Sequence, residues 1–190
     1  MAMPLISMCS CMFLLVSCLG GMQGFEIVWT DLQALRYNLQ YCSQRNDERG
    51  VSWPIIGRFK ARAGILDCYM IPIAGTTRSG IRFFTWTRRF VERLAMDGIT
   101  DGWAFQRPNG DRAKAADYRD NIFTKLEIIQ ATTNLIDSEC NVWDDYGIQR
   151  SGRRFFTTIC TIRKITKHIV ELQCRWMTDR EKGVGPSRGQ

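Results

Sequence analysis

Residues 12–37 read MFLLVSCLGGMQGFEIVWTDLQALRY and contain the two most pronounced apolar segments of the chain. Residues 12–19 carry no charge, and their unbroken apolar character predicts a helix. A run of glycines ends it. In residues 25–37 the apolar positions recur at helical spacing, which predicts a second helix. We therefore expect an apolar helix and an amphipathic helix joined by a glycine-rich break. The glycines are Gly20, Gly21 and Gly24, and the apolar positions are Phe25, Val28, Leu32 and Leu35.

The apolar start of the chain has two interpretations. Residues 1–20 resemble a secretory signal in hydropathy, but no Lys or Arg precedes Arg36, so the basic start of a signal is missing. Residues 13–19 are also too few to span a bilayer. We therefore expect a buried helix, no membrane association, and an intracellular protein that is nuclear in a eukaryotic host. The alternative is a secreted protein from which residues 1–20 have been removed.

The rest of the chain predicts a small sheet followed by further helices. Two strands are expected at residues 53–59 and 65–73, with a turn at Ala63-Gly64, and Asn109-Gly110 marks another turn. Cys68, Met70 and Pro72 should share one face of the second strand. Helices are expected at residues 83–96, 117–131, 151–163 and 166–176, with Ser151 and Thr166 as the capping residues of the last two. The predicted fold class is α+β and mainly helical, with an antiparallel hairpin or three-stranded sheet. A single domain should cover residues 1–182, followed by a frayed tail at 183–190.

Composition and the absence of known motifs argue against several classes of function. The 190 residues are 45% hydrophobic and 24% charged, as in ordinary globular domains. The eight Cys form no C-x-x-C pair and His168 is the only His, so we expect free thiols and no structural zinc. No phosphate-binding loop, dinucleotide motif or G-x-S-x-G stands in the sequence, so no cofactor is expected.

The net charge of +7 lies entirely in the last 42 residues. Residues 1–148 hold 16 basic and 16 acidic side chains, and residues 149–190 hold ten basic and three acidic ones. Such a one-sided segment indicates a polyanionic partner, and nucleic acid is the first candidate. The alternative is a solvated basic tail.

Two regions of the sequence, an arginine cluster and one lysine, could contact a phosphate. Arg150, Arg153 and Arg154 stand three and four residues apart at the start of an expected helix, where guanidinium groups and helix amides together favour phosphate. Lys60 lies near the tip of the expected hairpin and could reach a DNA backbone or donate a proton. For each position a solvated surface charge is the alternative.

Four segments together resemble the catalytic domain of tyrosine recombinases, and especially the recombinase-like proteins of eukaryotic mobile elements. Residues 21–26, GMQGFE, are similar to the family's G-x-R-x-x-E; Lys60 stands at the hairpin lysine; residues 150–158, RSGRRFFTT, are similar to its H-x-x-R box; and Arg175-Trp176 is similar to its late G-[HW] position. The resemblance implies that Glu26 and Arg150 belong to the catalytic site, that Arg153 is a phosphate ligand, and that Lys60 is a general acid. It implies that Trp176 donates a late hydrogen bond. DNA phosphate would meet Arg150, Arg153, Arg154 and Arg175.

Two departures from the family pattern lower the expected activity. Gln23 occupies the first arginine position, which removes one preorganised charge at the phosphate. The five Tyr all precede Trp176, whereas the family's nucleophilic Tyr follows that position. We therefore expect a truncated, DNA-binding remnant of a recombinase that functioned in DNA recombination and integration, without strand cleavage of its own. The alternative is a non-enzymatic nucleic-acid-binding or regulatory protein that assembles with complete recombinase protomers.

Overall fold

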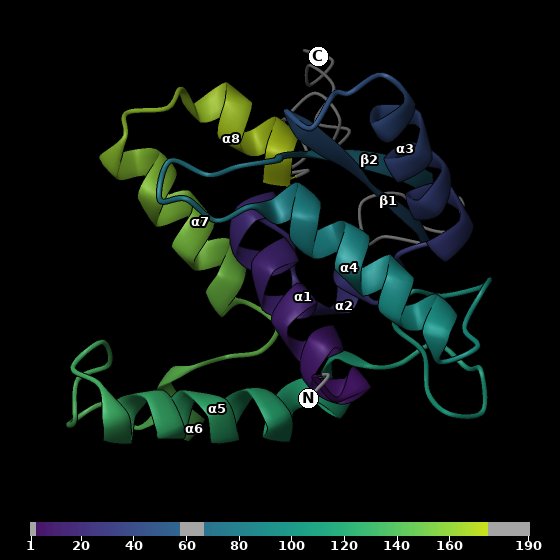
Figure 1. The fold of residues 1–190 in the computed structure, drawn as a ribbon. Coiled ribbons are helices and arrows are strands. Elements are labelled where there is room, and N and C mark those ends of the chain that lie inside the picture. Colours follow the sequence, from purple (N-terminus) through teal and green to yellow (C-terminus); the bar gives the residue numbers. More distant parts are fainter. Residues whose placement is uncertain (1–2, 58–66, 175–190) are drawn as a thin grey trace, which may run out of the picture.

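A computed structural model describes residues 3–57 and 67–174 (Figure 1). Helix α1 comes first, then a short α2 and a longer α3, a β-hairpin, and helix α4. A short 3₁₀ turn leads into α5, and three further helices follow. The bounds are α1 Leu5–Gly20, α2 Gly24–Ile27, α3 Leu32–Gln44, β1 Gly50–Gly57, β2 Asp67–Ala74, α4 Phe83–Met96, η1 Ala115–Tyr118, α5 Arg119–Thr132, α6 Val142–Asp145, α7 Ser151–Ile162 and α8 Lys167–Cys174. The predicted α+β, mainly helical fold class is confirmed.

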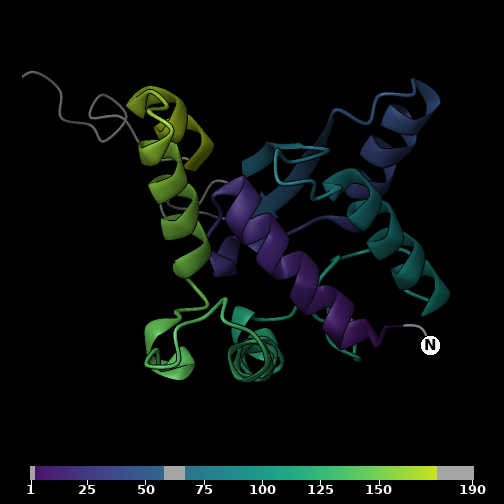
Figure 2. The ribbon, with the colours of Figure 1, turned by 60° about the vertical axis from the view of Figure 1, so that its left-hand side comes forward.

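Helix α1 is the central element of the fold. It runs between α7 on one side and α4 on the other, with the hairpin near its C-terminal end (Figures 1 and 2). Met12, Phe13 and Val16 are fully buried. Its uncharged sequence follows from this position, because a helix covered by neighbours on several sides leaves little surface for polar groups. The first apolar segment is thus a core helix, as the sequence predicted.

The single helix predicted over residues 25–37 is wrong. The chain leaves helical geometry after Ile27 and resumes it at Leu32, where the Asp31 side chain accepts a hydrogen bond from the Ala34 amide at 2.7 Å. Thr30 lies in this gap and forms a bridge to Ile55, and its buried hydroxyl accepts a hydrogen bond from the Trp53 indole at 2.7 Å. These contacts with β1 replace the helical turn that local periodicity alone would favour.

The hairpin pairs β1 and β2 antiparallel, from Gly50 opposite Ala74 to Gly57 opposite Asp67. Within the described residues the sheet has these two strands, and the Thr30–Ile55 bridge is a single pair beside it. Cys68, Met70 and Pro72 are exposed while Ile71 and Ile73 are buried, which confirms the predicted faces of β2. The expected turn at residues 63–64 lies outside the described residues.

Helix α4 matches the prediction at both ends, and Phe90 and Leu94 are buried on its inner face. The Asn109-Gly110 turn is present, with φ of +82° at Gly110 and a bridge between Gln106 and Arg112. The helix predicted over residues 117–131 is found as α5, which begins two residues later after a 3₁₀ turn. Helix α5 and the short α6 project together from the body of the molecule as an arm (Figure 1).

Helix α7 crosses α1 at close range and leads through a short turn into α8. Gly152 lies so near α1 that a Cβ on it would be 1.7 Å from the Ser17 hydroxyl oxygen. The predicted cap is wrong in detail. Arg150 occupies the capping position, and Ser151 is the first helical residue, whose hydroxyl accepts a hydrogen bond from the Gly147 amide at 2.9 Å. Helix α8 begins directly after Thr166, as predicted.

Candidate nucleic-acid interface

The loop that follows α1 is held against the approach to α7. Gly21 ends α1 with φ of +64°, a conformation that glycine adopts without strain. The Gly24 amide donates a hydrogen bond to the Gln149 carbonyl at 3.1 Å, and a Cβ on Gly24 would be 2.6 Å from the Ile148 carbonyl oxygen. The glycines at 21 and 24 therefore let residues 21–26 lie directly beside the residues that open α7.

An ion pair joins these two segments. Arg153 Nη2 lies 2.6 Å from Glu26 Oε2, across a sequence separation of 127 residues. Arg153 Nε also donates to the Gly21 carbonyl at 2.8 Å, at the C-terminus of α1, where a positive charge is favourable. The side chains are 12% and 7% exposed, so the pair is nearly withdrawn from solvent. The structure thus brings together Glu26 and Arg153, two residues that the family resemblance had placed in one site.

The backbone of Gln23 closes the start of α2. Its amide donates a hydrogen bond to Glu26 Oε2 at 2.7 Å, and its carbonyl accepts one from the Glu26 amide at 2.9 Å. Both contacts use main-chain groups of residue 23, so they do not depend on its side chain.

Arg150 and Arg154 differ from Arg153 in exposure. Both are exposed at the N-terminal end of α7, whereas Arg153 is turned inward to Glu26. The three guanidinium groups expected on one surface are thus divided into one inward and two outward groups. The outward pair adjoins the first amides of a 12-residue helix, which carry partial positive charge. This end of α7 can offer a phosphate two guanidinium groups in the positive field of a helix N-terminus.

The remaining predicted site residues cannot be located. Lys60 lies in residues 58–66, and Arg175 and Trp176 follow Cys174, so all three are outside the described residues. Their roles stay predictions. Strand β1 precedes and strand β2 follows the segment that contains Lys60.

The tyrosines differ sharply in surroundings. Tyr118 and Tyr146 are packed against the core, and burial raises the pKa of both phenols well above the usual range. Tyr37 and Tyr41 are exposed on α3, which lies on the far side of α1 from α7 in both ribbon views (Figures 1 and 2). None of these four phenols is placed at the start of α7.

All eight cysteines are free thiols, as predicted. Burial raises the pKa of the Cys9 thiol to about 12 and that of Cys18 to about 11, so both are protonated and unreactive near neutral pH. Across residues 3–57 and 67–174, no group of His, Cys, Asp and Glu side chains has the arrangement of a metal site. None of the helices in this part of the chain combines the length and the apolar character needed to span a bilayer.

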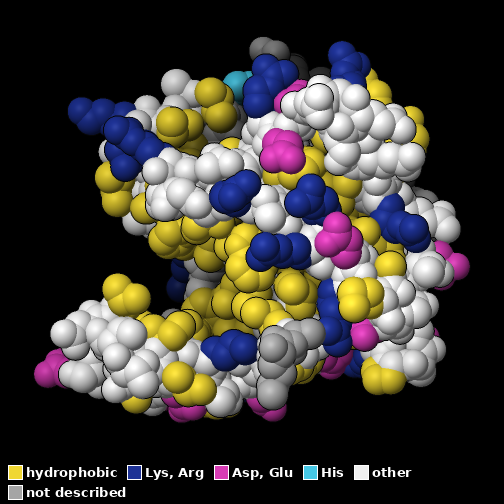
Figure 3. Space-filling view, in the orientation of Figure 1, with side chains coloured by type: hydrophobic (Ala, Val, Ile, Leu, Met, Phe, Trp, Pro, Cys, Tyr) yellow, Lys and Arg dark blue, Asp and Glu magenta, His cyan; other side chains and the backbone are white. Residues whose placement is uncertain are grey.

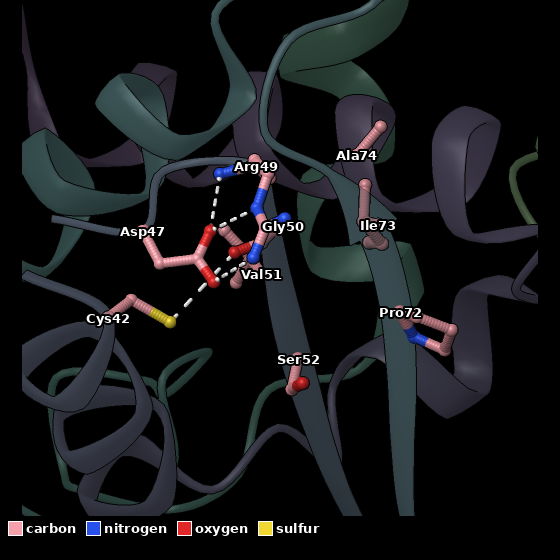
Figure 4. A pocket seen from close by; sticks show the side chains of 9 residues that line it. All are labelled: Cys42, Asp47, Arg49, Gly50, Val51, Ser52, Pro72, Ile73 and Ala74. Atoms are coloured by element: carbon pink, nitrogen blue, oxygen red, sulfur yellow. Dashed lines mark hydrogen bonds and ion pairs between the residues drawn. The ribbon is translucent and has the colours of Figure 1, made fainter. Parts of the chain in front are cut away.

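An open hollow beside the hairpin is separate from this site (Figure 4). Asp47 and Arg49 face one another on its wall, and the two hydrogen bonds from the Arg49 side chain hold the pKa of Asp47 low, at about 2. Cys42 and strand residues from β1 and β2 form the rest of the lining. Because its cation and anion pair with each other, the hollow offers no unsatisfied charge to a ligand.

Two positioning residues could not be assigned from sequence. Ser17 donates a hydrogen bond to the Met22 carbonyl at 3.1 Å and contacts the surface of Gly152, which fixes where α7 begins relative to α1. The backbone carbonyl of Gln149 accepts the hydrogen bond from the Gly24 amide, so the identity of its side chain could not have indicated this contact. No protein-family model, no curated protein and no solved structure matches this chain.

Proposed function

We propose that the protein binds the phosphate backbone of double-stranded DNA at the N-terminus of α7, on a scaffold derived from the catalytic domain of a tyrosine recombinase. The proposal assigns Arg150 and Arg154 to phosphate contacts. It assigns Arg153 and Glu26 to holding the start of α7 in place. It describes a DNA-binding descendant of a mobile-element enzyme, without strand cleavage of its own.

The observation that carries the proposal is the Glu26–Arg153 pair. These residues come from the two segments with the greatest resemblance to recombinase motifs, and they lie 2.6 Å apart, nearly buried. The two segments are far apart in the sequence, and the fold places them in contact. The meeting point is the start of a helix with two further exposed arginines, which is chemistry suited to phosphate.

Three features argue against strand cleavage by these residues. Gln23 supplies no charge at the position where the recombinase pattern has an arginine. The charge of Arg153 is offset by the Glu26 carboxylate at 2.6 Å. Tyr118 and Tyr146 are buried phenols with raised pKa values, so neither forms a nucleophilic phenolate near neutral pH. Transfer of a DNA phosphate to tyrosine needs a positive charge at position 23, an arginine at position 153 whose charge is not offset, and a tyrosine that can lose its proton.

The test is a fluorescence-anisotropy titration of nucleic-acid-free protein into a labelled DNA duplex. We expect the Arg150→Ala/Arg154→Ala variant to bind roughly tenfold or more weakly at moderate salt, since it loses two phosphate contacts. The matched control is Arg163→Ala/Lys167→Ala, which removes two exposed cations from the far end of α7 and the start of α8. Its affinity should change by less than about threefold, as expected for charges remote from the DNA.

Equal losses in the two variants would refute the assignment to the start of α7. Absence of binding by the wild-type protein at low salt would refute the proposed function. Cleavage is checked separately, by incubating the protein with a nicked duplex and separating it under denaturing conditions. We expect no covalent protein–DNA adduct, and its appearance would overturn the statement that the protein does not cleave DNA.

A further inference from the structure

Helix α7 carries a stripe of apolar side chains that is about half exposed in the described part of the chain. Phe155, Ile159 and Ile162 recur at helical spacing and are 52%, 41% and 66% exposed. Ile165, in the turn after α7, and Ile169, in α8, are two further exposed apolar side chains, at 43% and 57%. We call these five residues the α7 stripe. An exposed apolar patch of a few hundred Å² on a monomer commonly marks an interaction surface.

The stripe is distinct from the other two faces of α7. Gly152 and Cys160 are buried on the side that faces α1 and α8. Arg150 and Arg154 point outward at the N-terminal end and belong to the proposed DNA site. Helical geometry places Phe155 and Ile159 between these two faces. The stripe is therefore available to a partner that does not compete with phosphate at the start of α7.

The charges around the stripe are predominantly positive. Residues Ser151–Cys174, which comprise α7 and α8, hold five basic side chains and one acidic, a net charge of +4. Arg163, Lys164 and Lys167 are exposed near the middle of this segment. A partner should therefore present apolar side chains within an acidic surround.

The α5–α6 arm, Arg119–Asp145, has that chemistry. It holds six acidic side chains and two basic, a net charge of −4. Ile128 and Leu135 are 56% and 84% exposed on it. Figure 3 shows apolar side chains on the α7 side of the molecule and on the facing side of the arm, with an open hollow between them. The two surfaces are thus complementary in charge and both apolar, but do not meet within one chain.

We propose that the α7 stripe of one copy docks onto the α5–α6 arm of a second copy, in a head-to-tail contact. The apolar side chains supply the buried centre, and the opposite net charges of the two segments set the orientation. A two-fold contact between two stripes would bring +4 against +4, and one between two arms would bring −4 against −4. Because the contact joins different surfaces, each copy keeps one surface free for a further copy.

Sedimentation velocity of nucleic-acid-free protein over a wide concentration range, at low and high salt, provides the test. We expect wild-type association that strengthens at low salt, and an Ile162→Ser/Ile169→Ser variant that dissociates at least tenfold more readily. Both substituted side chains are exposed, so the fold should not depend on them. The matched control is Tyr37→Ser/Met96→Ser, which removes two large exposed side chains from α3 and α4 and should associate like wild type.

Paired charge reversals then test the head-to-tail arrangement. The first variant, Arg163→Glu/Lys167→Glu, takes the net charge of Ser151–Cys174 from +4 to 0, and the second, Asp120→Lys/Glu139→Lys, takes that of the arm from −4 to 0. Each alone should associate much more weakly than wild type, because one of its two surfaces no longer attracts the other. An equimolar mixture should associate more strongly than either variant alone, because the unaltered stripe of the second variant, at +4, can meet the unaltered arm of the first, at −4.

Each departure from this pattern overturns the proposal. Association of the second variant alone, comparable to wild type, would indicate a contact between two α7 stripes. A mixture that stays monomeric would show that the arm is not the partner of the stripe. A wild-type protein that is monomeric at every protein and salt concentration would show that a second copy does not bind the α7 stripe.

Discussion

The Glu26–Arg153 pair allows a quantitative test of how the two segments are joined. Exposed ion pairs contribute about 0–1 kcal/mol, whereas removal of one partner from a buried pair costs about 3–5 kcal/mol. The side chains of this pair are 12% and 7% exposed, so its energetics should be close to those of a buried ion pair. Arg153→Met should therefore destabilise the protein by about 3 kcal/mol, because the nearly buried Glu26 carboxylate loses its guanidinium counterion.

Glu26→Gln should cost about 2 kcal/mol, because the amide oxygen still accepts a hydrogen bond while the charge of Arg153 loses its counterion. The double variant removes both charges and should cost about 2 kcal/mol less than the sum of the two. The free energy of unfolding is measured by urea titration, followed through tryptophan fluorescence. Additivity within about 0.5 kcal/mol would show that the two groups do not interact, and would refute the reasoning.

Further predictions concern packing, pH and position 23. Gly152→Ala should destabilise the protein by about 3 kcal/mol, because its Cβ would lie 1.7 Å from the oxygen of a buried serine, whereas Gly147→Ala, with its nearest neighbour at 3.8 Å, should be nearly neutral in the same urea titration. Burial raises the pKa of Cys9 to about 12, so the protonated thiol contributes fully to the free energy of unfolding below pH 9, and this contribution is lost as pH rises from 9 towards 12. Between pH 8 and pH 10 the free energy of unfolding of wild type should therefore fall by about 1.4 kcal/mol more than that of Cys9→Ala. Equal losses would contradict the assignment to this thiol. Gln23→Arg should leave the free energy of unfolding nearly unchanged, because residue 23 contacts Glu26 through its backbone, and should tighten duplex binding at low salt. Weaker duplex binding by the folded variant would count against a phosphate near α2.

The sequence predicted the elements that local patterns determine. The uncharged run around Phe13 identified the core helix, and the periodicity through Phe90 identified α4 with both its ends. Alternation in residues 68–73 gave the correct inward and outward faces of β2. In each case one short stretch carries its own burial pattern, so no distant contact is needed to interpret it.

The features that were missed depend on distant contacts. The break before Asp31 is stabilised by Thr30 and Trp53, which are 23 residues apart. Arg153 was expected to face a phosphate together with its neighbours, and its inward turn depends on Glu26 at the other end of the chain. The resemblance to recombinase motifs named both residues of the pair but could not show that each neutralises the other.

The central claim, that the start of α7 binds the DNA backbone, is tested most directly by the salt dependence of duplex affinity. Each phosphate contact contributes about 0.9 to the slope of log affinity against log salt concentration. The account predicts that Arg150→Ala/Arg154→Ala lowers this slope by about 1.8, while Arg163→Ala/Lys167→Ala leaves it within about 0.5 of wild type. An unchanged slope in the first variant, with a reduced slope in the second, would contradict it.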